Sequence, residues 1–251
     1  MMDKAMLIDN FISELDTNRF GFNVAKLNES DFVFDPKTMI ESFKDNGVKL
    51  VMAKVNANDV DLINNLEGMG FGLKDIQVTY KYDLLNYEIT KYNNANVIIR
   101  DAAKYDCHSL EEIALESFDS YGHYAADKRI PAEVCKEIYR DWILRSLDNP
   151  NIADKVIVAE CDGEIAGFLS FKTHLNGSEY AAGGLGAVSP KFRNKDIFRM
   201  ISLGGLNWGK QIGLEWEEHN VLITNLPVNR SFSKLGFKIC NSFITMHLWI
   251  D

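Results

Sequence analysis

A short phrase occurs twice in this sequence, and each copy joins a predicted helix to a predicted strand. Gly70-Phe71-Gly72-Leu73 precedes Val78-Thr79, and 166 residues later Gly236-Phe237-Lys238-Ile239 precedes Ile244-Thr245. A constant offset indicates two copies of one folding unit, because a repeated unit keeps the spacing of its elements. Chance similarity between two helix-to-strand turns is the alternative.

The hydrophobic pattern around both copies alternates between strands and helices. In the first part of the chain it predicts a strand over residues 22–27, a helix over 36–46, a strand over 48–55 and a second helix capped near Asn58. In the second part it predicts strands over 155–161, 164–174 and 183–188, a helix from Asp196, a strand over 221–225 and a helix that ends at Gly236. Such alternation indicates an α/β fold.

Residues 86–96 mark the predicted domain boundary, because they are polar and rich in asparagine, as surface connections between domains often are. We therefore expect an N-terminal α/β lobe over residues 1–92 and a larger domain over residues 93–251. In the first lobe, residues 35–38 occupy the position that a basic turn occupies in the second domain. They have no phosphate-binding character. Only the second domain is expected to bind a phosphate.

Composition argues against several classes of protein. The chain has 251 residues and a net charge of -9, with its acidity spread along the sequence, so neither nucleic acid nor an anionic membrane is an expected partner. No apolar run approaches the ~20 residues that span a bilayer, and the N-terminus lacks the order of a signal peptide, so we expect a cytoplasmic protein. The four cysteines form no C-x-x-C pair, so we expect reduced, mostly buried thiols and no metal site.

The stretch from Gly183 to Arg199 carries most of the functional information, since it combines a predicted strand, a basic turn and the start of a helix. Four basic side chains and one acidic side chain give residues 191–199 a local charge of +3. The first N–H groups of a helix are unpaired and lie at the positive end of its dipole, so a strand leading into such a turn presents donors to an anion. A solvated basic loop before an ordinary helix is the alternative.

This stretch resembles the coenzyme A pyrophosphate loop of the GNAT N-acyltransferases. The chain has Val-x-Pro-x-Phe-Arg-x-Lys-x-Ile-x-Arg over residues 188–199, where the family usually has Arg-x-x-Gly-x-Gly/Ala. Asp196 and Phe198 stand at positions of small residues in the family, so their side chains must point away from the loop or reshape it. The resemblance implies an α/β GNAT fold with a mixed sheet, preceded by a smaller GNAT-like α/β lobe without a coenzyme loop.

A second informative stretch covers residues 120–127, which are richer in aromatic and hydrogen-bonding side chains than a plain connection. A helix follows from Pro131, and we expect its Ile138 and Trp142 to fill the core. A structural histidine is the alternative to a functional one at His123. The polar and aromatic residues of the stretch are Tyr121, His123, Tyr124 and Asp127.

Over most of its length the chain is similar to GNAT enzymes that act on dTDP-linked amino sugars, such as dTDP-fucosamine acetyltransferase. This similarity implies transfer of an acetyl or short hydroxyacyl group from a coenzyme A thioester to the amine of a dTDP-linked amino-dideoxy sugar, for surface polysaccharide synthesis. The partner is then a small molecule, and a homo-oligomer is an open question. The stretches that carry the similarity are residues 16–21; His123-Tyr124-x-Ala126-Asp127 with Tyr139-x-x-Trp142; and residues 225–237 with His247-x-Trp249.

The resemblance suggests roles for individual residues. His123 is our candidate for accepting the proton of the sugar amine, and the strand edge at Ala187 and Val188 is expected to polarise the thioester carbonyl. The sugar nucleotide would contact Tyr121, His123, Tyr124, Asp127 and Trp142. The candidate coenzyme A ligands are Gly186, Ala187, Val188, Arg193, Asn194, Lys195, Asp196, Ile197, Phe198 and Asn225.

Two departures concern the acyl group and the leaving thiolate. Gly184 and Gly186 have no side chains, so we expect one face of the strand to be bare and the acyl pocket to be larger than acetyl requires. The family commonly uses a tyrosine as general acid, seven residues after the asparagine matched by Asn225. That position is Phe232 here, so the usual proton donor is absent.

Other functions remain open. The departures at Asp196 and Phe198 also suit a regulatory protein that binds acyl-coenzyme A without transfer, and a GNAT enzyme for another small amine is a further alternative. Residues 204–211 nearly spell the phosphate loop of a nucleotide phosphotransferase. We favour close helix packing instead, because Gln211 replaces the hydroxyl that would hold magnesium and no strand directly precedes the segment.

Overall fold

The computed structural model describes residues 8–33, 35–91, 96–118, 120–174 and 177–250. Contacts divide the chain into two compact units. Unit 1 contains the chain up to Gln77, Gly122–Val134 and the end from Asn241, and unit 2 contains Val78–Tyr121 and Cys135–Cys240. This grouping differs from a single cut near residue 92, because unit 1 takes in two later segments.

Unit 1 contains a strand-helix-strand-helix-strand run. Its first two strands pair in parallel, and β2 pairs antiparallel with β9. Its core includes Phe43, Val51, Leu66, Phe71 and Met246. The elements are α2 (Glu14–Phe20), β1 (Asn23–Leu27), η1 (Glu29–Val33), α3 (Pro36–Asp45), β2 (Val48–Asn56), α4 (Val60–Gly68), α6 (Gly122–Ala126), and parts of β3 (Gly72–Asp83) and β9 (Lys238–Trp249).

Unit 2 contains a mixed sheet with the strand order β8-β7-β6-β5-β4. Neighbouring strands are antiparallel except for β7 and β8, which are parallel. The elements are β4 (Val97–Asp101), η2 (Lys104–Asp106), α5 (Cys107–Ser117), most of α7 (Ala132–Asp148), β5 (Lys155–Cys161), β6 (Glu164–His174), β7 (Tyr180–Val188), η3 (Pro190–Phe192), α8 (Ile197–Gln211), β8 (Trp216–Leu222) and α9 (Leu226–Leu235), together with the remaining parts of β3 and β9.

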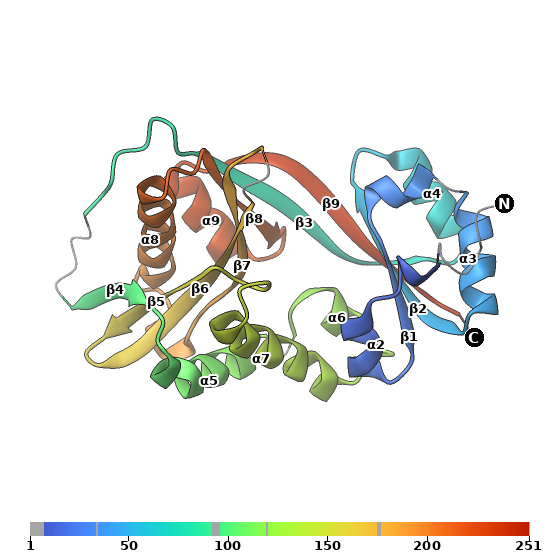
Figure 1. Cartoon of the computed structure of the whole chain (residues 1–251), viewed down its shortest axis with the longest axis horizontal. Helices are drawn as coiled ribbons and strands as arrows, with labels where there is room; N and C mark the ends of the chain where they lie inside the picture. The colour runs from blue at the N-terminus through green and yellow to red at the C-terminus, as the bar shows by residue number, and fades with distance from the viewer. Residues whose placement is uncertain (1–7, 34, 92–95, 119, 175–176, 251) are drawn as a thin grey trace. The chain divides into compact units, whose positions relative to one another are not determined.

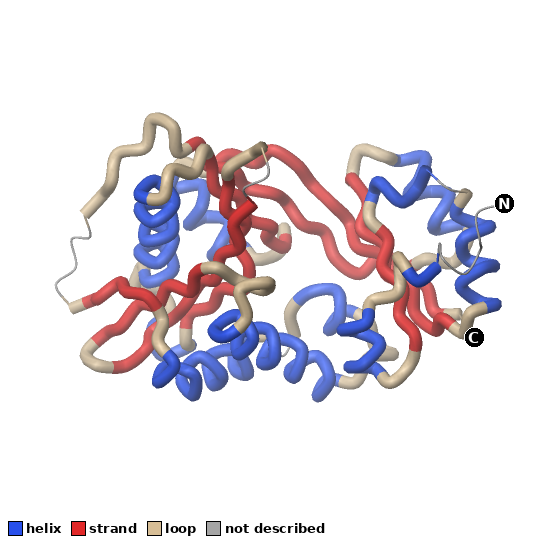
Figure 2. Tube along the Cα trace, in the orientation of Figure 1, coloured by secondary structure: helices blue, strands red, loops and turns tan. Residues whose placement is uncertain are grey.

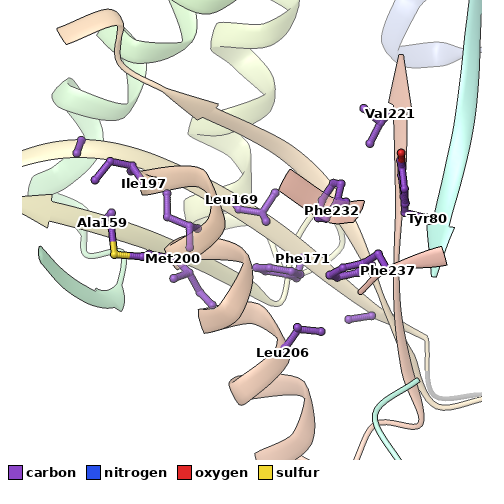
Figure 3. Packing of buried hydrophobic residues seen from close by; sticks show 14 of the residues in the cluster. Tyr80, Ala159, Leu169, Phe171, Ile197, Met200, Leu206, Val221, Phe232 and Phe237 are labelled. Carbon is purple, nitrogen blue, oxygen red and sulfur yellow. The ribbon is translucent and has the colours of Figure 1, made fainter. Parts of the chain in front are cut away.

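Helices cover both faces of this sheet (Figures 1 and 2). Side chains of α8 and α9 share one core with Leu169 and Phe171, as Figure 3 shows. Side chains of α5 and α7 share the other core with Phe168. Neighbouring residues of β6 therefore enter opposite cores, as the pleat of a strand buried on both faces requires.

The repeated phrase folds in the same way in both places. The helices α4 and α9 are each followed by a left-handed glycine, with φ of 95° at Gly70 and 94° at Gly236. In each copy the N–H of the next phenylalanine donates to the carbonyl five residues earlier, at 3.1 and 3.0 Å. The strands that follow, β3 and β9, are both 12 residues long and begin 166 residues apart. These matches support two copies of one unit.

Two local predictions were wrong. The strand predicted over residues 221–225 lies earlier, as β8, because the buried side chains of Glu217 and His219 are polar and hide the alternation of the strand. On α7, Ile138 is buried as predicted, but Trp142 is 37% exposed. A helical spacing of four residues places two side chains on one side of a helix without fixing how deeply each is buried.

The described helices include none that is both long and apolar enough to cross a membrane. The cysteines are free thiols, of which Cys135 and Cys161 are buried, Cys107 is partly buried and Cys240 is exposed. Only two of the four thiols therefore fit the expectation of burial.

Candidate functional site

The parallel strands β7 and β8 separate part-way along their length. Their pairing runs from Tyr180 with Trp216 to Gly183 with His219. Beyond Gly183, β7 continues to Val188 and pairs only with β6 among the described strands. The backbone of Gly186, Ala187 and Val188 therefore has one edge without a strand partner, as the predicted acyl-coenzyme A channel requires.

The turn after β7 leads into a helix whose start has no capping side chain. Asn194 and Asp196 adopt left-handed conformations, with φ of 62° and 64°. Asp196 is the N-cap residue of α8, but its carboxylate accepts from the Nε of Arg199 at 2.7 Å and does not cap the helix. The first N–H groups of α8 are thus left to an external acceptor at the positive end of the dipole.

Two of the four basic side chains in this turn are already paired. Lys191 pairs with Glu164, and Arg199 pairs with Asp196. Arg193 and Lys195 are exposed and have no acidic partner among the described residues. They are the cations of the turn that remain for a phosphate.

Both departures from the family pattern have partners within the protein. The carboxylate of Asp196 is held by Arg199, and the ring of Phe198 packs edge-on against Phe232 at 5.4 Å. Asp196 also takes the left-handed conformation that glycine would adopt most easily. Phe198 thus points into the core, whereas the exposed carboxylate of Asp196 stays beside the first turn of α8.

The apparent phosphate loop at residues 204–211 lies inside α8. Gly205 and Gly209 serve close packing, because an added Cβ would lie 2.4 Å from Phe171 and 2.9 Å from Leu84. A strand does not lead into this segment, so its backbone N–H groups are engaged in the helix. The phosphotransferase alternative therefore has no site here.

Two further predicted positions lie in α9 and at its start. Asn225 is the N-cap of α9, and its Oδ1 accepts from the N–H of Val228 at 3.4 Å, which leaves its amide nitrogen as a donor. Phe232 is fully buried and packs against the imidazole of His219 with ring centres 4.5 Å apart. Asn225 can therefore donate to a ligand, whereas Phe232 has no proton to give.

The expected bare face of β7 is filled. A Cβ on Gly184 would lie 2.6 Å from Oγ of Ser170, and a Cβ on Gly186 would lie 2.6 Å from the side chain of Leu169. The Oγ of Ser170 also accepts the N–H of Leu185 at 2.9 Å, where the pairing of β6 and β7 is irregular. The prediction of extra acyl room from these glycines is wrong, because β6 occupies that space.

A second constellation lies in unit 1 and contains His123 of α6. Its Nδ1 lies 2.9 Å from Nε2 of His247, whose Nδ1 lies 2.8 Å from Oδ2 of Asp127. Trp249 donates its indole N–H to the same carboxylate oxygen at 3.0 Å. The two sequence stretches that contain these histidines, 124 residues apart, thus meet in one hydrogen-bonded chain.

The carboxylate fixes the tautomers of both rings. The ionised carboxylate of Asp127 can only accept, so His247 donates from Nδ1 and accepts at Nε2. His123 must then donate from Nδ1, and its Nε2 carries the free lone pair. Burial, reinforced by the neighbouring His247, lowers the pKa of His123 to about 3. The ring is therefore neutral at physiological pH, and its unprotonated Nε2 is directed away from the chain of hydrogen bonds.

The other two members of the chain are also shifted. Burial lowers the pKa of His247 although the Asp127 carboxylate opposes this shift. Burial acts to raise the pKa of Asp127, but hydrogen bonds from Trp249 and His247 hold that pKa below its usual range. One negative charge thus anchors two neutral imidazoles.

A buried carboxylate that sequence reasoning missed lies beside this chain. The hydroxyl of Tyr124 donates to Oδ1 of Asp16 at 3.2 Å, and Asp16 also pairs with Lys26 and Arg19. Asp16 belongs to the first stretch that carried the family similarity. That was the only available signal for its contact with Tyr124, because the two residues are 108 positions apart.

The predicted acceptor residues do not form a single group. His123, Tyr124 and Asp127 belong to unit 1, whereas Tyr121 and Trp142 belong to unit 2. The ring of Tyr121 packs against Phe118 and Tyr139. The predicted role of Tyr121 and Trp142 in sugar-nucleotide binding stays a prediction.

The sequence matches no family model and no curated protein. Its structure is similar to solved acetyltransferases. A GCN5-related N-acetyltransferase from Kribbella flavida aligns with a TM-score of 0.62 at 11% identity, over 90% of this chain and 80% of its own. A tandem GNAT protein from the clavulanic acid biosynthesis pathway aligns with a TM-score of 0.58 at 16% identity, over 84% and 67% of the two chains. A GCN5-related N-acetyltransferase from Sphaerobacter thermophilus gives a TM-score of 0.57 at 13% identity, over 85% of this chain and 66% of its own.

The chain has the GNAT fold. This confirms the predicted α/β class and mixed sheet, and the tandem GNAT neighbour fits a chain with two related lobes. Similarity at such low identity establishes the fold alone. The reaction and the acceptor must be argued from the residues of the site.

Proposed function

We propose that this protein is an N-acyltransferase that uses a coenzyme A thioester. The observation that carries the proposal is the separation of β7 from β8 directly before a helix start that has no capping side chain. An open strand edge suits the amide groups of pantetheine, and a helix N-terminus with Arg193 and Lys195 suits a pyrophosphate. An open strand edge and an uncapped helix start are each common. Here one follows the other along the chain, as the pantetheine and the pyrophosphate of coenzyme A follow one another.

The coenzyme would be held mainly by backbone groups. The N–H groups at residues 197–199 and the cations of Arg193 and Lys195 would bind the pyrophosphate. The free edge of Gly186, Ala187 and Val188 would pair with pantetheine and polarise the thioester carbonyl, and the amide of Asn225 would donate to the pantetheine arm. Asn194 and Asp196 give the turn its left-handed bends, and Ile197 and Phe198 anchor it in the core.

The acceptor is proposed to be the amine of a dTDP-linked amino sugar, with acetyl or a short hydroxyacyl group as the acyl chain. Two sequence stretches that carry the similarity to such enzymes supply the His123–His247–Asp127 chain, which supports this choice. An ammonium has no lone pair for attack, so the amine must lose a proton. Nε2 of His123 is the proposed acceptor of that proton, directly or through water. Because the pKa of the ring is about 3, the proton would stay on His123 only briefly before it passes to water.

Ligand binding and turnover separate this proposal from its alternatives. Thermal unfolding would be followed with acetyl-coenzyme A, a four-carbon hydroxyacyl-coenzyme A, ATP and a dTDP-amino sugar; a ligand at about 100 times its Kd adds about 2.7 kcal/mol to stability. Stabilisation by an acyl-coenzyme A and by the sugar nucleotide, with release of free thiol when both are present, is the expected result. Stabilisation by the acyl-coenzyme A alone, without thiol release to any amine, would indicate the regulatory protein.

The acceptor half of the proposal has its own control. Thiol release with another small amine but not with the dTDP-amino sugar would keep the N-acyltransferase and reject the sugar nucleotide. The variant His123→Asn retains a donor toward His247, since the Asn amide lies where Nδ1 of the ring lies, but it removes the basic nitrogen. An unchanged kcat in this variant would contradict the role of His123 as base.

A further inference from the structure

The core of unit 2 contains a carboxylate and an imidazole at positions where the first copy of the repeat has apolar residues. Residues 166 positions before Glu217 and His219 are Val51 and Ala53, and all four are buried. Val55 and Val221, the next pair at this offset, are both buried valines. The fold therefore accepts aliphatic side chains at these positions, and burying polar groups there disfavours folding unless they serve another purpose.

The two polar side chains form one hydrogen-bonded pair at the point where β7 and β8 separate. Nε2 of His219 lies 2.7 Å from Oε1 of Glu217. The other edge of the imidazole lies against the backbone of Gly183, the last residue of β7 that pairs with β8; a Cβ there would be 1.8 Å from Nδ1. Among the described residues, Oε2 of Glu217 is buried without a hydrogen-bond partner, and the hydrogen bond between Nε2 and Glu217 leaves Nδ1 of His219 for another partner.

The surroundings of the pair are almost entirely apolar. His219 contacts the rings of Phe171, Phe232 and Phe237. Glu217 lies beneath Gly205 of α8, where an added Cβ would be 3.0 Å from Oε2. The pKa of Tyr87 is raised mainly by burial, and the charge on Glu217 adds to this shift. Burial raises the pKa of Glu217, which favours retention of a proton within the pair.

We propose that the Glu217–His219 pair donates the proton to the coenzyme A thiolate that leaves during acyl transfer. This inference rests on the proposed function. The free edge of β7 begins directly after Gly183, beside which His219 lies. Pantetheine that enters at Val188 runs along this edge toward that point, so its thioester end is the part nearest Nδ1. Phe232, which cannot donate, packs on the same imidazole.

The proton transfer is balanced within the pair. The Nδ1–H bond of His219 breaks as the S–H bond of coenzyme A forms, with the sulfur lone pair accepting the proton. The proton shared between Oε1 and Nε2 settles on Nε2, so Glu217 is left as a carboxylate. Water restores the lost proton after the products leave, and no oxidant or other reagent is needed.

The first copy of the repeat supplies the matched variant. The double substitution Glu217→Val with His219→Ala installs the residues that the fold already buries in unit 1, so it should fold at least as stably as the wild type. We expect it to bind acetyl-coenzyme A with unchanged Kd and to lose about 10²-fold in kcat. The single variant His219→Asn should show a similar loss, and adding Phe232→Tyr should restore part of it by placing a phenol beside the thiolate.

A second measurement is independent of turnover. The thiol pKa of bound coenzyme A, followed by thiolate absorbance, should rise in the His219→Asn variant, which a purely structural role for His219 would not cause. An unchanged thiol pKa, or a kcat within twofold of wild type in the folded double variant, would overturn the inference while leaving the acyltransferase intact. Failure of the wild type to bind coenzyme A would instead overturn the proposed function, and the donor role with it.

Discussion

Lowering the pH from 8 to 5 should destabilise the protein through His123, and the size of this effect follows from the structure. The pKa of the ring is about 3 in the folded protein and about 6.5 in the unfolded chain. The unfolded state then binds a proton between these values that the folded state does not. A depressed pKa contributes stability that is present above pH 6.5 and is lost as the pH falls toward 3.

The expected loss at pH 5 is about 2 kcal/mol. One pKa unit corresponds to about 1.4 kcal/mol, and at pH 5 the unfolded ring is ~1.5 units below its own pKa whereas the folded ring is still neutral. The result depends little on the folded pKa as long as that value stays below about 4. For a chain of this length, 2 kcal/mol lowers Tm by roughly 4 to 8 °C.

Urea unfolding of wild type and His123→Asn at pH 8 and pH 5 measures this contribution. His247 and the carboxylates remain in the variant, so their pH dependence is largely common to both proteins. The stability lost between pH 8 and pH 5 in the wild type, minus that lost in the variant, therefore gives the contribution of His123 together with its coupling to His247. The charged or titratable groups that act on His123 are His247, Lys26, Lys54 and Asp16. Repeating the measurement at several salt concentrations shows how much of the pH effect comes from these neighbouring charges, because salt screens them. Replacing His108, whose side chain is 80% exposed, with asparagine is the matched control for the loss of a histidine. Equal losses in wild type and His123→Asn would refute the neutral buried base.

Three further predictions concern ligand binding. Arg193→Glu or Lys195→Glu should weaken acyl-coenzyme A binding at least tenfold by calorimetry and leave binding of the sugar nucleotide unchanged. Lys191→Glu should weaken it less, because the amine of Lys191 already pairs with Glu164. Equal loss of both ligands would argue against separate sites. Asp196→Gly should tighten acyl-coenzyme A binding, since it removes a carboxylate next to the phosphates and relieves a φ of 64°, and weaker binding would contradict the geometry of the turn. Trp142→Ala should raise the KM for the sugar nucleotide, and an unchanged KM would remove Trp142 from the site. Because Trp142 is only 37% exposed, the substitution should also cost about 3 kcal/mol of stability in urea.

The elements of the fold were predictable where neighbouring residues in the sequence determine the local backbone structure. The glycine after each helix, the alternation of strands and helices, and the basic turn before Ile197 are all visible within a few residues of sequence. Prediction failed at β8, because Glu217 and His219 break the apolar pattern of a buried strand. It also failed at Gly184 and Gly186, because the atoms that fill their missing side chains come from β6.

The histidine chain illustrates a different limit. The stretch containing His123 and Asp127 was recognisable as functional, but the ring between them is His247, 120 residues after Asp127. No spacing rule connects the two, since they meet only when β9 and α6 fold into unit 1. The tautomer of His123, and hence which nitrogen is basic, follows only from that contact.

Comparison of the two copies explains why coenzyme binding is proposed for the second copy alone. In the first copy, β1 pairs with β2 as far as Leu27, the last residue of β1, so β1 does not part from β2 as β7 parts from β8. The helix that follows, α3, is capped by Asp35, whose Oδ2 accepts the N–H of Thr38 at 2.9 Å. A carboxylate thus already occupies the place of an anion at that helix start. In the second copy Asp196 turns to Arg199 instead, β7 parts from β8, and Val51 and Ala53 are matched by Glu217 and His219. Under the proposed function, these three differences would act on the phosphates, the pantetheine and the thiolate of coenzyme A in turn.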